Sequence, residues 1–143
     1  MSLSFSQTLA GHRLQLQRSA PEILQLNVGK MCNLACQHCH VNAGPWRKER
    51  MSREVLERIL AWLEPTDIST VDLTGGAPEM LEDFRWLVQR LRKGEKARKV
   101  IDRCNLTILL EPGYREVPAF LAEHQVEIVA SMPCYSPDNV NAQ

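Results

Sequence analysis

Residues 24–45 read LQLNVGKMCNLACQHCHVNAGP and place Cys32, Cys36 and Cys39 directly behind a short apolar stretch that is typical of a strand. No further cysteine follows until Cys104. Three thiolates are one short of the four that bind an iron–sulfur cube, one on each iron, so one iron would keep an open position. An open position usually distinguishes a catalytic metal site from a structural one, as it does for zinc. The stretch therefore indicates a catalytic metal centre behind the first strand.

The same cysteines could instead serve a zinc site or disulfides. Zinc would take the three thiolates together with His38 or His40, since sites with three cysteines and one histidine are common. Structural zinc sites usually pair knuckles from two segments, and this sequence has only one. Disulfides are disfavoured because the cysteine count of five is odd and no secretory signal is evident. A zinc-binding or thiol module without turnover stays the alternative to an enzyme.

Composition narrows the class of protein. The 143 residues correspond to one ordinary domain, and a hydrophobic content of 44% supports a packed core. The formal charge is zero and the pI is about 6.9, so nothing indicates binding to nucleic acid or to an acidic membrane surface. No apolar run approaches the ~20 residues of a membrane span. We therefore expect a cytoplasmic, reduced protein, in which clustered cysteines bind metal or take part in chemistry.

Strands and helices are predicted to alternate after a weakly periodic N-terminal extension, residues 1–22. The predicted strands are residues 23–28, 68–74, 99–104 and 126–131. Apolar residues at helical spacing predict two helices between them, one capped by Ser52 and one ended by Gly94. A short helix with Pro118 near its first turn precedes the last strand. The inward positions expected of these helices are Val55, Leu56, Ile59, Leu60, Leu63, Phe84, Leu87, Val88, Leu91, Phe120 and Leu121.

The order β-α-β-α-β-α-β predicts an α/β fold with a parallel sheet, because strands that alternate with helices are joined by right-handed crossovers. Ligands of such sheets bind at the carboxyl ends of the strands. Four separate segments supply candidate groups at that rim, and their convergence predicts one functional site. The segments are the three clustered cysteines, Gly75-Gly76, Cys104-Asn105 and Ser131.

The C-x3-C-x2-C spacing of the three cysteines resembles that of the radical S-adenosylmethionine (SAM) enzymes. The likeness extends over most of the chain, in the strings LQLNVGKMCNLACQHCHVNAGP, DLTGGAPEM, IDRCNLTILLEPG and EIVASMPCYSPDNV. Together these strings are similar to the arsenosugar biosynthesis radical SAM protein family. HCHVNAGP and RCNLTILLEPG are the most specific of them, since they are long and unusual in content.

The resemblance implies a partial radical SAM barrel of six parallel strands, of which this chain would supply about four. Residues 23–143 would form an incomplete core domain, and the additional C-terminal domain of the resembled family would be absent. On this basis we expect a truncated product, a split reading frame or a fragment. An uncovered fourth strand would also promote aggregation through its free edge.

The resemblance also implies cofactors and a reaction. A [4Fe–4S] cluster held by Cys32, Cys36 and Cys39 would bind the amino and carboxylate groups of SAM at its open iron. One electron from a donor such as flavodoxin or ferredoxin would then release a 5′-deoxyadenosyl radical. In the resembled family the deoxyadenosyl group passes to a methylated trivalent arsenical and gives an arsenosugar precursor. The cofactor carries the difficult chemistry and the protein positions it.

Further contacts with SAM follow from the same resemblance. Gly75 and Gly76 match a glycine-rich turn whose backbone carbonyls face the SAM amino group, and a missing Cβ permits that close approach. The common form of this turn has glutamate where this chain has Ala77, so Glu79 is expected to supply the acid. A plain turn from strand to helix is the alternative.

His38 stands where the superfamily usually has an aromatic residue beside the adenine, and is otherwise a solvated loop residue. His40 is a candidate donor of a hydrogen bond to a cluster sulfur, which would raise the reduction potential. Asn105 and Ser131 end the third and fourth strands. They are expected to meet the ribose or carboxylate of SAM, or else to cap their strands.

Two further thiols, Cys104 and Cys134, lie on or just past strand ends at the same rim. Thiolate is the soft ligand that suits trivalent arsenic. One or both are therefore predicted to hold the arsenical beside the deoxyadenosyl carbon. The alternative for each is a buried cysteine that acts as a small hydrophobe.

Overall fold

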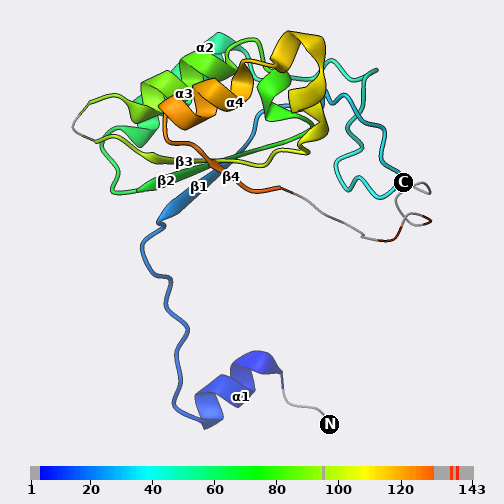
Figure 1. Ribbon diagram of the computed structural model, residues 1–143. Helices are drawn as coiled ribbons and strands as arrows, with labels where there is room; N and C mark the ends of the chain where they lie inside the picture. Colours follow the sequence, from blue (N-terminus) through cyan, green and yellow to red (C-terminus); the bar gives the residue numbers. More distant parts are fainter. Residues whose placement is uncertain (1–3, 95, 131–135, 137, 139–143) are drawn as a thin grey trace.

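The computed structural model describes residues 4–94, 96–130, 136 and 138, and contains a four-stranded parallel sheet (Figure 1). Its strands lie in chain order as β1 (Ile23–Asn27), β2 (Thr70–Thr74), β3 (Lys99–Asp102) and β4 (Glu127–Ile128). The helices that join them are α2 (Arg53–Leu63), α3 (Phe84–Arg92) and α4 (Val117–Glu123). All three helices cover the same face of the sheet (Figure 1). The predicted α/β partial barrel with about four parallel strands is confirmed.

The core lies between the sheet and these helices. Val71, Leu73 and Val100 point from the strands into it and are fully buried. Each helix contributes the apolar face predicted from its spacing, and burial of each such side chain stabilises the fold by roughly 1.5–3 kcal/mol. The fully or largely buried helix residues are Leu56, Leu63, Phe84, Leu87, Val88, Leu91, Val117, Phe120 and Leu121.

Three details differ from the prediction. Val55 is 43% exposed and does not belong to the apolar face of α2, because it stands about 100° around the helix from the fully buried Leu56. The strands are shorter than their apolar runs; β4, for example, pairs with β3 through only two residues. The third difference concerns the charged stretch Arg90–Lys99, whose composition predicts a solvated helix end and loop. Arg98 in this stretch is buried, and its guanidinium donates to the carbonyls of Leu63 and Thr66 at 3.0 Å, groups that the end of α2 leaves free.

The N-terminal segment contains one short helix, α1 (Phe5–Gly11), which Figure 1 shows apart from the sheet. Ser4 caps it, and the Gln7 side chain returns a hydrogen bond to the Ser4 backbone, a reciprocal pair that stabilises a helix start. None of its residues is buried. Among the described residues, no helix has the length and apolar character needed to cross a membrane.

Three short 3-10 helices follow the strand ends and carry residues of the site. They are η1 (Pro78–Met80) after β2, and η2 (Thr107–Leu110) and η3 (Pro112–Tyr114) after β3. The residues on the carboxyl ends of the parallel strands therefore lie at one rim of the sheet, which is where ligands of such sheets bind.

Candidate active site

The cysteine loop, residues 28–51, is closed by backbone hydrogen bonds between its two ends. The Met51 N–H donates to the Val28 carbonyl at 2.9 Å, and the Lys30 N–H donates to the Glu49 carbonyl at 2.9 Å. Further in, the Gly44 N–H donates to the Lys30 carbonyl at 3.0 Å. The loop is therefore a closed excursion from the end of β1, and its ends are fixed by the sheet.

Arg47 holds the returning arm of this loop. Its Nη1 donates to the Asn42 carbonyl at 2.9 Å, and its Nε donates to the Glu49 carboxylate at 3.0 Å. This guanidinium lowers the pKa of Glu49 to about 2 by hydrogen bonding. Both partners therefore stay charged over the whole physiological pH range.

The three cysteine sulfurs of the loop differ in burial and in hydrogen bonding. Cys32 is only 7% exposed, whereas Cys36 and Cys39 are partly exposed. The backbone N–H of Leu34 donates to Cys32 Sγ at 3.5 Å, and that of Ala43 donates to Cys39 Sγ at 3.3 Å. Burial, and then the charges of the other two cysteines, raise the pKa of the Cys36 thiol. As thiolates, these groups would repel one another unless a cationic centre binds them.

The spacing of these sulfurs bears on which metal they fit. Tetrahedral zinc, with bonds of about 2.3 Å to sulfur, holds its thiolates about 3.8 Å apart. Among the described residues, the one group of three metal-binding side chains with ligand atoms within 4.8 Å of one another is Glu79, Asp102 and Cys104. At least one pair of the loop sulfurs is therefore more than 4.8 Å apart, which exceeds the spacing around a shared zinc ion, whereas a cube binds each thiolate to a different iron. The donor set fits a [4Fe–4S] cluster better than zinc.

The glycine turn after β2 lies directly against the start of the cysteine loop. The Gly76 N–H donates to the Gly29 carbonyl at 3.0 Å, and the Ala77 N–H donates to the Met31 carbonyl at 2.8 Å. A Cβ on Gly76 would lie 2.1 Å from the Met31 oxygen. Gly75 has φ +145° and would place a Cβ 2.5 Å from the Gly29 oxygen. Only glycine fits at either position, because the turn packs against the backbone at the start of the cysteine loop.

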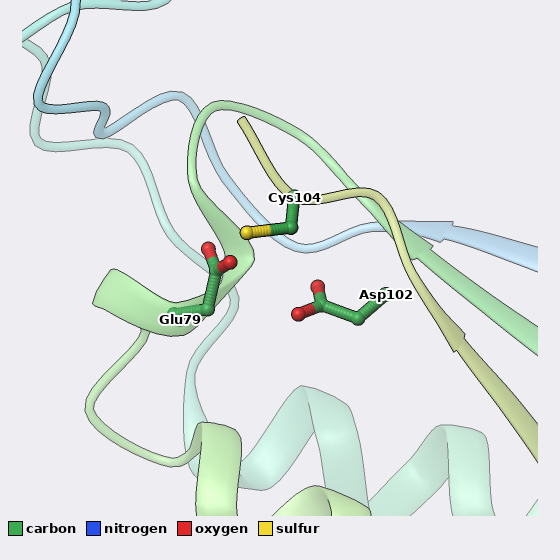
Figure 2. Close-up of side chains that lie close together, drawn as sticks. All are labelled: Glu79, Asp102 and Cys104. Atoms are coloured by element: carbon green, nitrogen blue, oxygen red, sulfur yellow. The ribbon is translucent and has the colours of Figure 1, made fainter. Parts of the chain in front are cut away.

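A cluster of three buried side chains, Glu79, Asp102 and Cys104, lies behind this turn (Figure 2). Their exposures are 5%, 0% and 1%. Glu79 comes from η1, Asp102 is the last residue of β3, and Cys104 lies two residues beyond it, so the three side chains join two neighbouring segments of the rim. As carboxylates, neither acid would have a hydrogen-bond donor. One proton must therefore lie between them, because two adjacent buried carboxylates cannot both ionise without great cost.

The surroundings of Asp102 favour its protonated form. Burial, and then the charge and hydrogen bond of Glu79, raise the pKa of Asp102 to about 8. Protonated Asp102 can donate to Glu79, and the Cys104 thiol lies beside the same carboxylate. Burial and the Glu79 carboxylate raise the pKa of Cys104 strongly, so it is a thiol rather than a thiolate at neutral pH.

A polar hollow opens on the side of the sheet that the helices leave uncovered. It has a volume of about 260 Å³ and is lined by Gln25, Asn27, His40, Thr74 and Arg103. These residues come from the strand ends and from the cysteine loop. The hollow therefore adjoins the segment that carries the three sulfurs.

Comparison with known proteins agrees with this arrangement. The model of the Radical SAM superfamily matches residues 26–132, from β1 past β4. The chain belongs to the radical SAM superfamily. Radical SAM proteins are enzymes whose cofactors are a [4Fe–4S] cluster and SAM.

The curated relatives belong to another radical SAM branch than the arsenosugar family that the sequence strings resemble. A probable GTP 3′,8-cyclase of Pyrococcus horikoshii is 37% identical over 70 residues, which is 48% of this chain and 22% of that protein. Those of Pyrococcus abyssi and Thermoplasma volcanium are 33% and 29% identical over 69 and 70 residues, covering 48% and 49% of this chain. The chain thus matches less than a quarter of each relative's length.

The other residues predicted to contact SAM differ in how far they are exposed. His38 is exposed on the cysteine loop, and Asn105 is half-buried beside Cys32. Among the described residues, the loop sulfurs accept hydrogen bonds from the backbone N–H groups of Leu34 and Ala43 and from the Asn105 side chain. His40, which was predicted to be such a donor, is not among them. Ser131 and Cys134 lie outside the described residues.

Asp102 is the residue of this rim that sequence reasoning missed. It shares a face of β3 with Val100, which is fully buried, and its register partner on β2 is Leu73. A charged residue at an inward position of a strand was the available signal. The burial of its partner Glu79, which was predicted to contact SAM, could not be predicted in the same way, because η1 has no strand or helix period.

Proposed function

We propose that this chain is the cluster- and SAM-binding part of a radical SAM enzyme, with Cys32, Cys36 and Cys39 as the ligands of a [4Fe–4S] cluster. The observation that carries the proposal is the pairing of the cysteine loop with the glycine turn. Gly76 and Ala77 hydrogen-bond to the backbone that leads into Cys32. A ligand at the sulfurs would therefore adjoin the turn that is expected to receive the SAM amino group.

The residues of the chain would hold and orient the two cofactors. When bound, the cluster supplies the electron that cleaves SAM to a 5′-deoxyadenosyl radical, with flavodoxin or ferredoxin as the external donor. Gly75 and Gly76 would offer carbonyls to the SAM amino group, and His38 would lie beside the adenine. Ser131 remains a candidate for the ribose. The Glu79 side chain is buried beside Asp102 and Cys104, so we expect it to fix the turn rather than to touch SAM.

The substrate we propose is a methylated trivalent arsenical, which would accept the deoxyadenosyl group in arsenosugar biosynthesis. The support is the likeness of HCHVNAGP and RCNLTILLEPG to the arsenosugar family. Of the two thiols predicted to hold arsenic, Cys104 is buried and its pKa is raised, which disfavours the thiolate that arsenic binds. Cys134 is therefore the thiol to test first.

The second candidate substrate is GTP. It is favoured by the 37% identity over 70 residues to a probable GTP 3′,8-cyclase. The two candidates differ in chemistry, since an arsenical needs a thiol and a nucleotide does not. Binding of dimethylarsinous acid and of GTP to the cluster-loaded chain, each with wild type and Cys134→Ser, distinguishes them. Arsenical binding that Cys134→Ser abolishes supports the first candidate; GTP binding unaffected by Cys134→Ser supports the second.

Anaerobic reconstitution with iron and sulfide tests the cluster assignment. We expect wild type to take up four irons and to give an EPR signal that shifts on addition of SAM. Cys36→Ser should lower cluster content by about tenfold or more, since even outer contacts of metal sites change affinity by 10–100-fold. Cys104→Ala is the matched control, because it removes a thiol outside the loop and should leave the cluster intact. Stoichiometric zinc in place of iron would contradict the proposal and favour the zinc module.

A further inference from the structure

Asn105 connects the end of β3 to the cysteine loop. Its Nδ2 lies 3.6 Å from Cys32 Sγ and 2.8 Å from Asn33 Oδ1. Its Oδ1 accepts from the Ile108 N–H at 3.0 Å and from the Thr107 hydroxyl at 3.1 Å. Both donors and both lone pairs of the amide are thus used within the protein. The amide has no hydrogen-bonding capacity left for the SAM ribose or carboxylate that was predicted for it.

The orientation of the Asn105 amide is fixed by its partners. The backbone N–H of Ile108 can only donate, so the amide oxygen must face it and the amide nitrogen must face the cysteine loop. A ring of hydrogen bonds supports this choice. Asn105 donates to Asn33, Asn33 donates to Thr107 at 3.0 Å, and the Thr107 hydroxyl donates back to Asn105.

Asn105 is also the one side chain, among the described residues, that donates to any of the three loop sulfurs. The other donors are the backbone N–H groups of Leu34 and Ala43. A substitution can remove the Asn105 donor and leave the backbone donors in place. The contribution of this single hydrogen bond can therefore be measured.

We propose that Asn105 is a positioning residue of the cluster site, which holds the Cys32 thiolate through an N–H···S hydrogen bond and raises the reduction potential of the cluster. The proposal rests on the cluster ligation by Cys32, Cys36 and Cys39 proposed above. A donor at a ligand sulfur stabilises negative charge there, and reduction adds negative charge to the cluster. Hydrogen bonds to ligand sulfurs are therefore among the factors that set cluster potentials.

The test is a redox titration of the reconstituted chain, followed by EPR, on matched variants. Asn105→Asp keeps the shape and the oxygen contacts but replaces the N–H donors with an acceptor and a negative charge. Asn105→Ser removes the amide N–H that reaches Cys32, because the serine side chain is shorter, and adds no charge. We expect both to shift the midpoint potential downward, Asn105→Asp more than Asn105→Ser. Thr107→Val breaks the ring of hydrogen bonds at another point but keeps the N–H near Cys32, so its potential should match that of wild type.

Two measurements make the outcomes distinct. Iron content and the urea midpoint of the cluster-free chain show whether a variant still folds and loads. Unchanged potentials in both Asn105 variants with normal iron content would overturn this inference and leave the cluster assignment standing. A wild-type chain that takes up no cluster would overturn the cysteine assignment, and this inference with it. A Thr107→Val shift as large as that of Asn105→Ser would mean that the loop connection, rather than the N–H···S bond, sets the potential, and would also contradict the proposal.

Discussion

Gly76→Ala is expected to destabilise the chain by about 3 kcal/mol, the upper part of the range for forcing an extra carbon into a packed site. The new Cβ would lie 2.1 Å from the Met31 oxygen and 3.0 Å from the carbonyl carbon of Lys30. These are backbone atoms, and they cannot move aside freely. The Met31 carbonyl accepts from the Ala77 N–H, and Met31 also pairs with Gly44 across the cysteine loop.

The same clash should reach the cofactor site. Displacement of Met31 moves the backbone that leads into Cys32, so we expect Gly76→Ala to lower cluster content and to remove the EPR response to SAM. Gly113→Ala is the matched control, because a Cβ there has nothing within 4 Å. It should change stability by no more than about 0.5 kcal/mol. Urea unfolding of both variants measures the difference; equal midpoints would show that the turn is not held against the loop.

Local sequence patterns were sufficient to predict the order of the elements. Helix spacing identified the buried face of α3, and Ser52 caps α2 as expected. The strand ends were not predictable in the same way, because a strand ends where its hydrogen-bonding partner ends. β4 illustrates this, since its apolar run is longer than the two residues that pair with β3.

The candidate site also combines features that a local sequence pattern predicts with contacts between distant segments that it does not predict. The three cysteines lie within eight residues, so their spacing alone identified the superfamily. The contact of Asn105 with Cys32 joins residues 73 apart in the sequence, and that of Glu79 with Asp102 depends on the placement of η1 against β3. Such contacts follow from the register of the sheet, which no local pattern contains. The polar groups that support the site were therefore the part that sequence reasoning assigned differently or missed.

Asp102→Asn is expected to remove a pH dependence of stability between about pH 4 and pH 8. The folded chain keeps the Asp102 proton up to about pH 8, whereas an unfolded aspartate releases it near pH 3.9. Between these values unfolding releases one proton, so the free energy of unfolding falls as pH rises, by up to about 1.4 kcal/mol per pH unit. The stabilisation is complete below pH 4 and is lost once pH passes 8. Asparagine does not titrate, and its amide can still donate to Glu79.

Urea unfolding at several pH values compares the two chains, and the difference between their free energies should change steadily from pH 4 to pH 8. Asp67→Asn, at an exposed carboxylate, is the matched control and should follow wild type. Parallel curves for wild type and Asp102→Asn would show that no proton lies between the carboxylates. A wild-type stability that falls on addition of EDTA would instead place a divalent cation among Glu79, Asp102 and Cys104. If the two carboxylates share a proton, the contact between η1 and β3 is strongest at low pH. We therefore expect the glycine turn to become less stable as pH approaches 8, and the change of the EPR signal on addition of SAM to become smaller.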